Sequence, residues 1–212
     1  MPRSVARATL RRMWTASSPH GPDEQFLRRM SAPDNEVPVA LPVNVVLART
    51  DDVAVALLRL EVYSTGLEFC LAARVRADAA LRNPLAELMW GRPRAHGRFL
   101  LGVEFADGRR ASSLAQRGGH QEVVLGPRGA SGGRLRLDQC WWLAPLPPEG
   151  PMRFVVRSDE LGIEETSVEL DGADVRAAAA GVVELWPWAP GPSPDHREPP
   201  PPPLPPDSWF AE

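Results

Sequence analysis

The chain has no lysine. All 24 of its basic residues are arginine, and isoleucine occurs once among its 212 residues. A genome rich in G and C, in which the codons for lysine and isoleucine are scarce, accounts for both absences. The same codon bias produces arginine clusters and proline runs that need no functional explanation. The net charge of −3 favours neither a nucleic acid nor an anionic membrane as a partner, so we expect neither.

Long hydrophobic runs are missing as well. The longest, Val53 to Leu58, is far shorter than the roughly 20 residues that span a bilayer. No apolar region of a secretory signal follows the arginines near the N-terminus, so we expect a cytoplasmic location. Cys70 and Cys140, the two cysteines, are then expected to remain thiols. They could lie on neighbouring strands, but the sequence does not establish a Cα separation short enough for a disulfide.

Strong catalytic and metal-binding motifs are absent too. The four histidines show no metal-ligand spacing, and the strongest catalytic fragment, His120 with Glu122, does not define a site. Residues 126–133 are rich in glycine but lack the lysine of a phosphate-binding loop. We therefore assign no catalytic, cofactor-binding or metal-binding residue and expect no cofactor, and we lean against an enzyme.

The clearest pattern in the chain is an alternation of side chains with a period of two residues. Between residues 37 and 47 an apolar side chain stands at every odd position, and similar alternation recurs several times before residue 171. This period is typical of strands with one buried face. We predict an all-β protein: an antiparallel β-sandwich of about seven or eight strands, with one short helix between strands and one C-terminal helix.

The expected elements follow from the alternation and its breaks. Pro38 and Pro42 place the first strand at a sheet edge, because proline cannot donate a ladder hydrogen bond. The expected strands span about residues 37–49, 53–63, 67–76, 98–105, 109–114, 135–143, 152–156 and 166–170, and the run from residue 67 has the pattern of a half-exposed strand. Asn83 and Pro84 begin the helix between strands, and the second helix spans residues 174–184.

Composition divides the chain into three parts. Residues 1–34 are an arginine-, serine- and proline-rich lead that we expect to be disordered. Residues 35–188 form the sandwich domain and include a glycine-rich segment, 115–133, expected to be a mobile loop. Residues 189–212 are a proline-rich tail expected to be disordered or in polyproline II conformation.

Tryptophan is the most informative residue type for binding. Trp141 and Trp142 are neighbours on one strand and point to opposite faces, so one lies in the core and the other lies outside or under a cover. We favour a cover formed by the C-terminal helix and Trp186. In the tail, the proline run from Pro199 to Pro206 could dock on an aromatic groove. The candidate partner-binding residues are Trp142, Trp188, Trp209 and Phe210.

Several segments together resemble an uncharacterised family of β-rich proteins from high-GC bacteria. They are the strand and hairpin from Phe99 to Gly108, the glycine-rich loop, the Trp141-Trp142 strand, residues 145–151, residues 161–166 and Glu184-Leu185-Trp186-Pro187. The resemblance covers about residues 35–188. That family has no assigned activity, so it implies the domain boundaries and no functional residue.

Three functional hypotheses follow. The first is a non-catalytic β-sandwich domain that binds an unknown protein partner or a second copy of itself. The second is a small hydrolase-like enzyme with a site under the glycine-rich loop, which requires a hollow there with polar side chains within hydrogen-bond reach. The third is a carbohydrate- or lipid-binding module, which requires Trp142 and a second aromatic ring exposed side by side.

Overall fold

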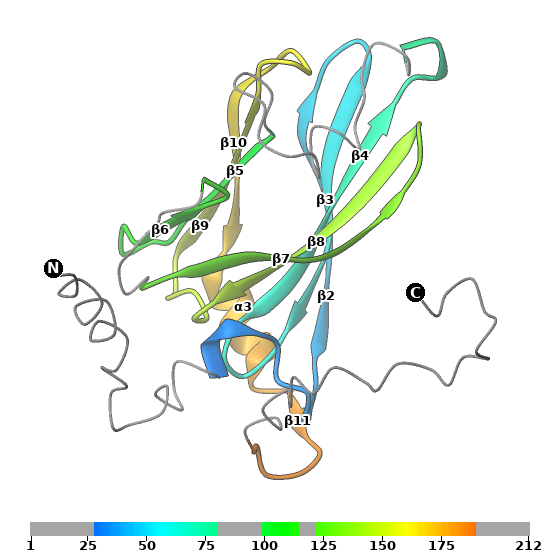
Figure 1. Cartoon of the computed structure of the whole chain (residues 1–212). Coiled ribbons are helices and arrows are strands. Elements are labelled where there is room, and N and C mark those ends of the chain that lie inside the picture. The colour runs from blue at the N-terminus through cyan, green and yellow to red at the C-terminus, as the bar shows by residue number, and fades with distance from the viewer. Residues whose placement is uncertain (1–27, 80–98, 115–121, 190–212) are drawn as a thin grey trace, which may run out of the picture.

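The computed structural model describes residues 28–79, 99–114 and 122–189. Two antiparallel sheets face each other in this part of the chain, which confirms the predicted all-β class (Figure 1). One sheet has five strands, in the order β2 (Val39–Arg49), β3 (Val53–Val62), β4 (Leu67–Val75), β8 (Arg136–Ala144) and β7 (Val124–Gly132). The other has four, in the order β10 (Ile163–Asp171), β9 (Pro151–Ser158), β5 (Leu100–Glu104) and β6 (Arg110–Ser112).

Shorter elements complete the described part of the chain. Strands β1 (Glu36–Val37) and β11 (Val183–Glu184) form a separate two-stranded sheet. A single 3-10 turn, η1 (Ala77–Ala79), follows β4, and helix α3 (Gly172–Ala179) follows β10. The described residues thus hold 11 strands rather than seven or eight, because short pairings such as β1 with β11 carry no alternation that could reveal them.

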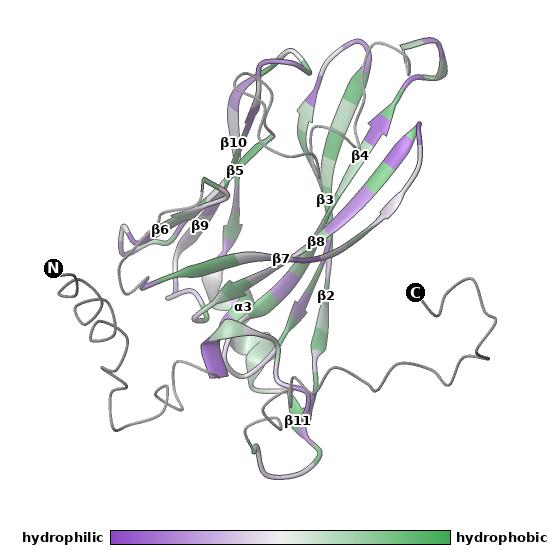
Figure 2. Ribbon diagram, in the orientation of Figure 1, coloured by the Kyte–Doolittle hydropathy of each residue, from purple (hydrophilic) through white to green (hydrophobic). Residues whose placement is uncertain are grey.

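The core lies between the two large sheets. Phe69 of β4 meets Phe154 of β9 edge to face, with ring centroids 5.1 Å apart, and both rings are fully buried. The side chains buried between the sheets are apolar, and the ribbons of the strands carry both hydrophobic and hydrophilic colours along their length (Figure 2). An edge-to-face aromatic pair adds about 0.5–1.5 kcal/mol beyond its area burial. The two-residue alternation in the sequence therefore arises because the strands of both sheets bury one face in the same apolar core.

Helix α3 is shorter than the sequence predicts. It begins after Asp171, whose carboxylate accepts a hydrogen bond from the Ala173 N–H and caps the helix. It ends at Ala179 rather than at residue 184, just before Gly181, which disfavours continuation. Val183 and Glu184 then pair with β1 instead of extending the helix.

Three other predictions have different outcomes. The first strand is an edge strand as predicted, and the second is internal. The third, β4, is buried along most of both faces instead of being half-exposed, because Cys70 and Ala72 on its outer face are covered. The expected helix at residues 83–91 lies outside the described residues.

The glycine-rich segment is only partly a loop. Residues 115–121 lie outside the described part, but residues 124–132 form β7, an edge strand paired with β8. Pro127 fits there because an edge strand leaves one row of backbone N–H groups unpaired in any case. The predicted mobile loop is therefore wrong for residues 124–132.

Order begins before residue 35. Residues 28–30 are helical, and Ala32 is buried against Trp142 of β8. The indole N–H of Trp142 donates a 2.8 Å hydrogen bond to the Arg29 carbonyl. The end of the expected disordered lead, residues 28–34, is therefore packed on the outer face of the five-stranded sheet.

A carboxylate between two arginines ties three strands of the smaller sheet together. Glu104 of β5 stands directly opposite Arg110 of β6 and Arg153 of β9. Arg110 donates to it at 2.7 Å, and Arg153 donates from the other side. These hydrogen bonds hold the pKa of Glu104 below its ordinary value of 4.5.

We predict that Glu104→Gln lowers the melting temperature at pH 7 and that the loss shrinks at low pH. A lowered folded-state pKa contributes stability above the ordinary pKa, and that stability disappears as pH falls through the folded value. Thermal unfolding at pH 7 and at about pH 3, with Glu164→Gln as the control for charge loss, measures it. An equal deficit at both pH values contradicts the prediction.

Candidate functional site

The two cysteines face each other across adjacent strands. Cys70 of β4 stands directly opposite Cys140 of β8, with a Cα–Cα separation of 4.1 Å, and the pair forms a disulfide. The expectation that both remain thiols is therefore wrong for this structure. The register of β4 and β8, which brings two residues 70 positions apart into contact, cannot be read from their spacing.

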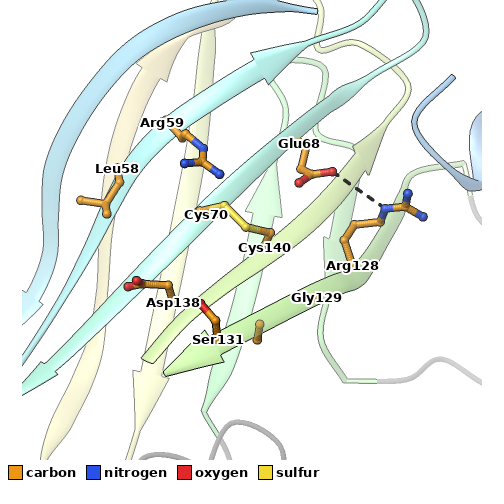
Figure 3. A pocket seen from close by; sticks show the side chains of 10 residues that line it. Leu58, Arg59, Glu68, Cys70, Arg128, Gly129, Ser131, Asp138 and Cys140 are labelled. Carbon is orange, nitrogen blue, oxygen red and sulfur yellow. Dashed lines mark ion pairs between the residues drawn. A yellow bond between two sulfur atoms is a disulfide. The ribbon is translucent and has the colours of Figure 1, made fainter. Parts of the chain in front are cut away.

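A hollow of about 560 Å³ opens over this pair, and we call it the cysteine hollow (Figure 3). Its origin is the row of residues that crosses the outer face of the sheet: Arg59 of β3, Cys70, Cys140 and Gly129 of β7. Gly129 has no side chain to cover Cys140, and β7 bulges beside it. The hollow is lined further by Leu58, Glu68, Arg128, Ala130, Ser131 and Asp138.

Charged groups of both signs surround the disulfide. Arg128 points toward Glu68 from the bulge in β7, and its Nε lies 3.9 Å from a Glu68 carboxylate oxygen (Figure 3). Burial raises the pKa of Glu68, and the neighbouring Glu61 raises it further, whereas Arg128 and Arg59 oppose the shift. Glu68 is thus a partly buried carboxylate beside two sulfur atoms.

The other carboxylate of the hollow is already engaged. Asp138 accepts a 2.6 Å hydrogen bond from Arg74, which lies diagonally across from it on β4. Of the two acids in the hollow, Glu68 is therefore the one that remains close to the cysteines, since its ligand atom lies within 4.8 Å of both sulfurs.

The sequence around Ser131 resembles a motif that holds a catalytic serine nucleophile in hydrolases. The segment from Gly129 to Gly133 has the spacing Gly-x-Ser-x-Gly. In hydrolases that motif places serine at a sharp strand-to-helix turn. Here Ser131 lies within an edge strand that leads into a β-hairpin, and no described residue lining the hollow is a histidine. The described geometry therefore does not build a serine nucleophile.

We predict that reducing the disulfide lowers the free energy of unfolding by about 4 kcal/mol, the chain-entropy value for a loop of this length. Urea unfolding with and without a phosphine reductant measures it. The double variant Cys70→Ser/Cys140→Ser is the control and should be insensitive to reductant. An unchanged midpoint for the wild-type chain on reduction contradicts the prediction.

A second hollow, of about 420 Å³, lies where the two ends of the described chain meet, and we call it the tryptophan groove. Arg28 and residues 30–35 form one wall, and Trp186, Trp188 and Ala189 form the other. The Arg28 guanidinium lies 4.5 Å from the centre of the Trp188 ring. Trp186 is 58% exposed, a high value for the largest apolar side chain.

One buried acceptor in the tryptophan groove lacks a donor. Asn35, which is 5% exposed, donates through Nδ2 to the Trp186 carbonyl at 2.7 Å, and its own carbonyl accepts from the Leu185 N–H. Its Oδ1 has no hydrogen-bond partner among the described residues. A buried polar atom in this state costs about 1–3 kcal/mol unless a ligand or water satisfies it.

Exposed apolar side chains continue from the groove onto the small sheet. Val37 of β1 and Val183 of β11 stand directly opposite each other, and each is about half exposed. Met30 and Leu185 nearby are exposed to a similar degree. Single exposed apolar residues are ordinary, but a cluster around a groove marks an interaction surface.

The four predicted partner-binding residues differ in where they lie. Trp142 is 1% exposed and packs against Tyr63, with ring centroids 5.7 Å apart, so it presents no platform to a ligand. Its cover is the segment at residues 29–32, not the C-terminal helix and Trp186 as we expected. Trp188 lines the tryptophan groove. Trp209 and Phe210 lie outside the described residues.

No protein-family model matches this chain, and searches of curated proteins and of solved structures find no similar protein. Within the described ranges, none of the helices has the length and apolar character needed to cross a bilayer. The two hollows therefore have to be interpreted from their own geometry.

Proposed function

We propose that the protein is a non-catalytic β-sandwich domain that self-associates, and that the tryptophan groove of one copy binds the proline-rich segment at residues 199–206 of a second copy. The observation that carries the proposal is a groove lined by two tryptophans, of which Trp186 is 58% exposed. Grooves lined by aromatic side chains are the typical receptors for polyproline II segments. We also propose a cytoplasmic location.

The chemistry of the segment suits the groove. Residues 199–206 are proline except for Leu204, which supplies the single backbone N–H between Pro199 and Pro206. A polyproline helix loses little entropy on binding because it is preorganised.

The position of the segment favours a second copy over the same chain. The described part of the chain ends at Ala189, which lines the groove. Residues 190–198 include three prolines, and such linkers behave as extended spacers of about 3.1 Å per residue. Nine residues at that rise span at most about 28 Å, a length that would let residue 199 reach the groove of a second copy.

The competing hypotheses have weaker support. The carbohydrate or lipid reading required Trp142 to be exposed beside a second aromatic ring, and Trp142 is buried. The hydrolase reading has a hollow beside the glycine-rich segment, but its closest pair of opposite charges, Glu68 and Arg128, is 3.9 Å apart, beyond hydrogen-bond reach. Its two cysteines are joined to each other.

We predict that the full-length chain forms a concentration-dependent dimer and that Trp186→Ala weakens it at least about tenfold, because a buried interface tryptophan is commonly worth more than 1.4 kcal/mol. Sedimentation equilibrium measures the dissociation constant. A synthetic peptide of residues 197–210 should dissociate the dimer and shift the fluorescence of the wild-type chain but not of Trp186→Ala.

The matched control is Leu135→Ala, which removes another exposed apolar side chain, 45% exposed, just before the start of β8 and outside the groove. A chain that stays monomeric at high micromolar concentration, or a dimer that Trp186→Ala leaves intact, overturns the proposal. A monomer whose groove nevertheless binds the peptide would also overturn self-association and would assign the groove to another proline-rich partner.

A further inference from the structure

Three metal-ligating side chains lie together in the cysteine hollow. One ligand atom from each of Glu68, Cys70 and Cys140 lies within 4.8 Å of the other two. Glu68 and Cys70 are two residues apart on one face of β4, and Cys140 stands opposite on β8 (Figure 3). Two sulfurs and one carboxylate form a donor set of the kind that holds zinc with three protein ligands and one open position.

We infer that the reduced form of the cysteine hollow is a zinc site, in which the thiolates of Cys70 and Cys140 and the carboxylate of Glu68 bind one Zn²⁺. Water occupies the fourth position. The disulfide is the metal-free, oxidised state of the same site. This inference concerns the outer face of the five-stranded sheet and does not depend on the proposed function.

The conversion between the two states balances with a dithiol reductant. The reductant passes two electrons and two protons to the Cys70–Cys140 bond, which breaks to give two thiols, and the reductant leaves as its own disulfide. Zn²⁺ then displaces the two thiol protons to solvent, since thiolates are the form that binds metal. Exchange with a small-molecule disulfide reverses the step: the disulfide takes two electrons from the two thiolates and two protons from solvent, leaves as a pair of thiols, and Zn²⁺ is released as the Cys70–Cys140 bond re-forms.

The backbone already has the geometry that the metal requires. Zinc–sulfur bonds of about 2.3 Å in a tetrahedron place the two sulfurs about 3.8 Å apart. The cysteine Cα atoms are held 4.1 Å apart by the strand pairing, and both side chains point to the same face. Rotation of the side chains is therefore enough to separate the sulfurs, and Gly129 leaves room above Cys140.

The charges of the hollow suit a metal complex of this kind. Two thiolates and one carboxylate around Zn²⁺ carry a net charge of about −1. Arg59 and Arg128 line the same hollow and offset it. Two soft sulfur ligands favour Zn²⁺ over Mg²⁺ or Ca²⁺, which prefer sites made only of oxygen.

The test is a zinc titration of the full-length chain against a chromogenic chelator, in a phosphine reductant without oxygen. We expect one Zn²⁺ per reduced chain and no binding at this site in the oxidised chain. Glu68→Gln keeps both cysteines and should bind at least about tenfold more weakly, as expected when one ligand is lost. Glu61→Gln, which removes the same charge from the position directly opposite Glu68, is the matched control and should keep the wild-type affinity.

Cobalt substitution supplies a readout that a purely structural role would not change. The reduced chain with Co²⁺ should show thiolate-to-cobalt charge-transfer absorption, and Cys140→Ser should lose about half of it. Equal zinc affinity of the reduced and oxidised chains overturns the inference. So does equal affinity of Glu68→Gln and Glu61→Gln. Both comparisons use proteins that retain the cysteines, so a serine variant that fails to fold does not decide the outcome.

Discussion

The register of β4 against β8 is the constraint on which the rest of the structure depends. In this register Phe69 stands opposite Trp141 on the inner face, and Cys70 stands opposite Cys140 on the outer face. A slip of one residue would move every side chain of β4 to the other face. Phe69 would leave its contact with Phe154, and the cysteines would separate. The core and the cysteine hollow thus lie on opposite faces of the same pair of strands, β4 and β8.

Strand β8 also connects the two candidate surfaces. Cys140 and Trp142 are two residues apart on its outer face, so the cysteine hollow and the cover over Trp142 are neighbours. That cover, residues 29–32, continues into the segment that walls the tryptophan groove. The hydrogen bond from Trp142 to the Arg29 carbonyl therefore holds one wall of the groove in place from the sheet below. A buried tryptophan that binds no partner still positions the residues proposed to bind one.

The sequence predicted features that arise from local periodicity and failed on features that arise from pairing. Alternation located β2, β4, β5, β8, β9 and β10, an apolar run located β3, and the prolines of β2 placed it at an edge. Strand β7 was missed because its glycines and Pro127 have low strand propensity, and only the free edge of β8 makes it a strand. The disulfide was missed because register is a tertiary property, and Cys70 and Cys140 are 70 residues apart.

Trp142 illustrates the same limit at the candidate site. Parity indicated correctly that one of Trp141 and Trp142 faces away from the core, but it did not say which, and nothing local showed that residues 29–32 would cover Trp142. The sequence indicated Trp186 only as part of the cover over Trp142, whereas the pairing of β1 with β11 brings it next to Asn35. Binding surfaces built from both ends of a chain depend on contacts of long sequence separation, which composition does not encode.

The oxidation state of Cys70 and Cys140 depends on the redox conditions around the protein. A disulfide persists in an oxidising compartment, whereas thiol reductants of a cytoplasm keep such pairs open. The apolar layer between the sheets does not include the sulfur atoms, because Cys70 and Cys140 point to the outer face. Opening the pair thus removes a crosslink without removing core packing. The disulfide on the outer face can therefore open and close while the apolar core on the inner face keeps the two sheets packed. Because the cysteines lie outside the core, the cysteine hollow can have both an oxidised form and the proposed metal-binding form.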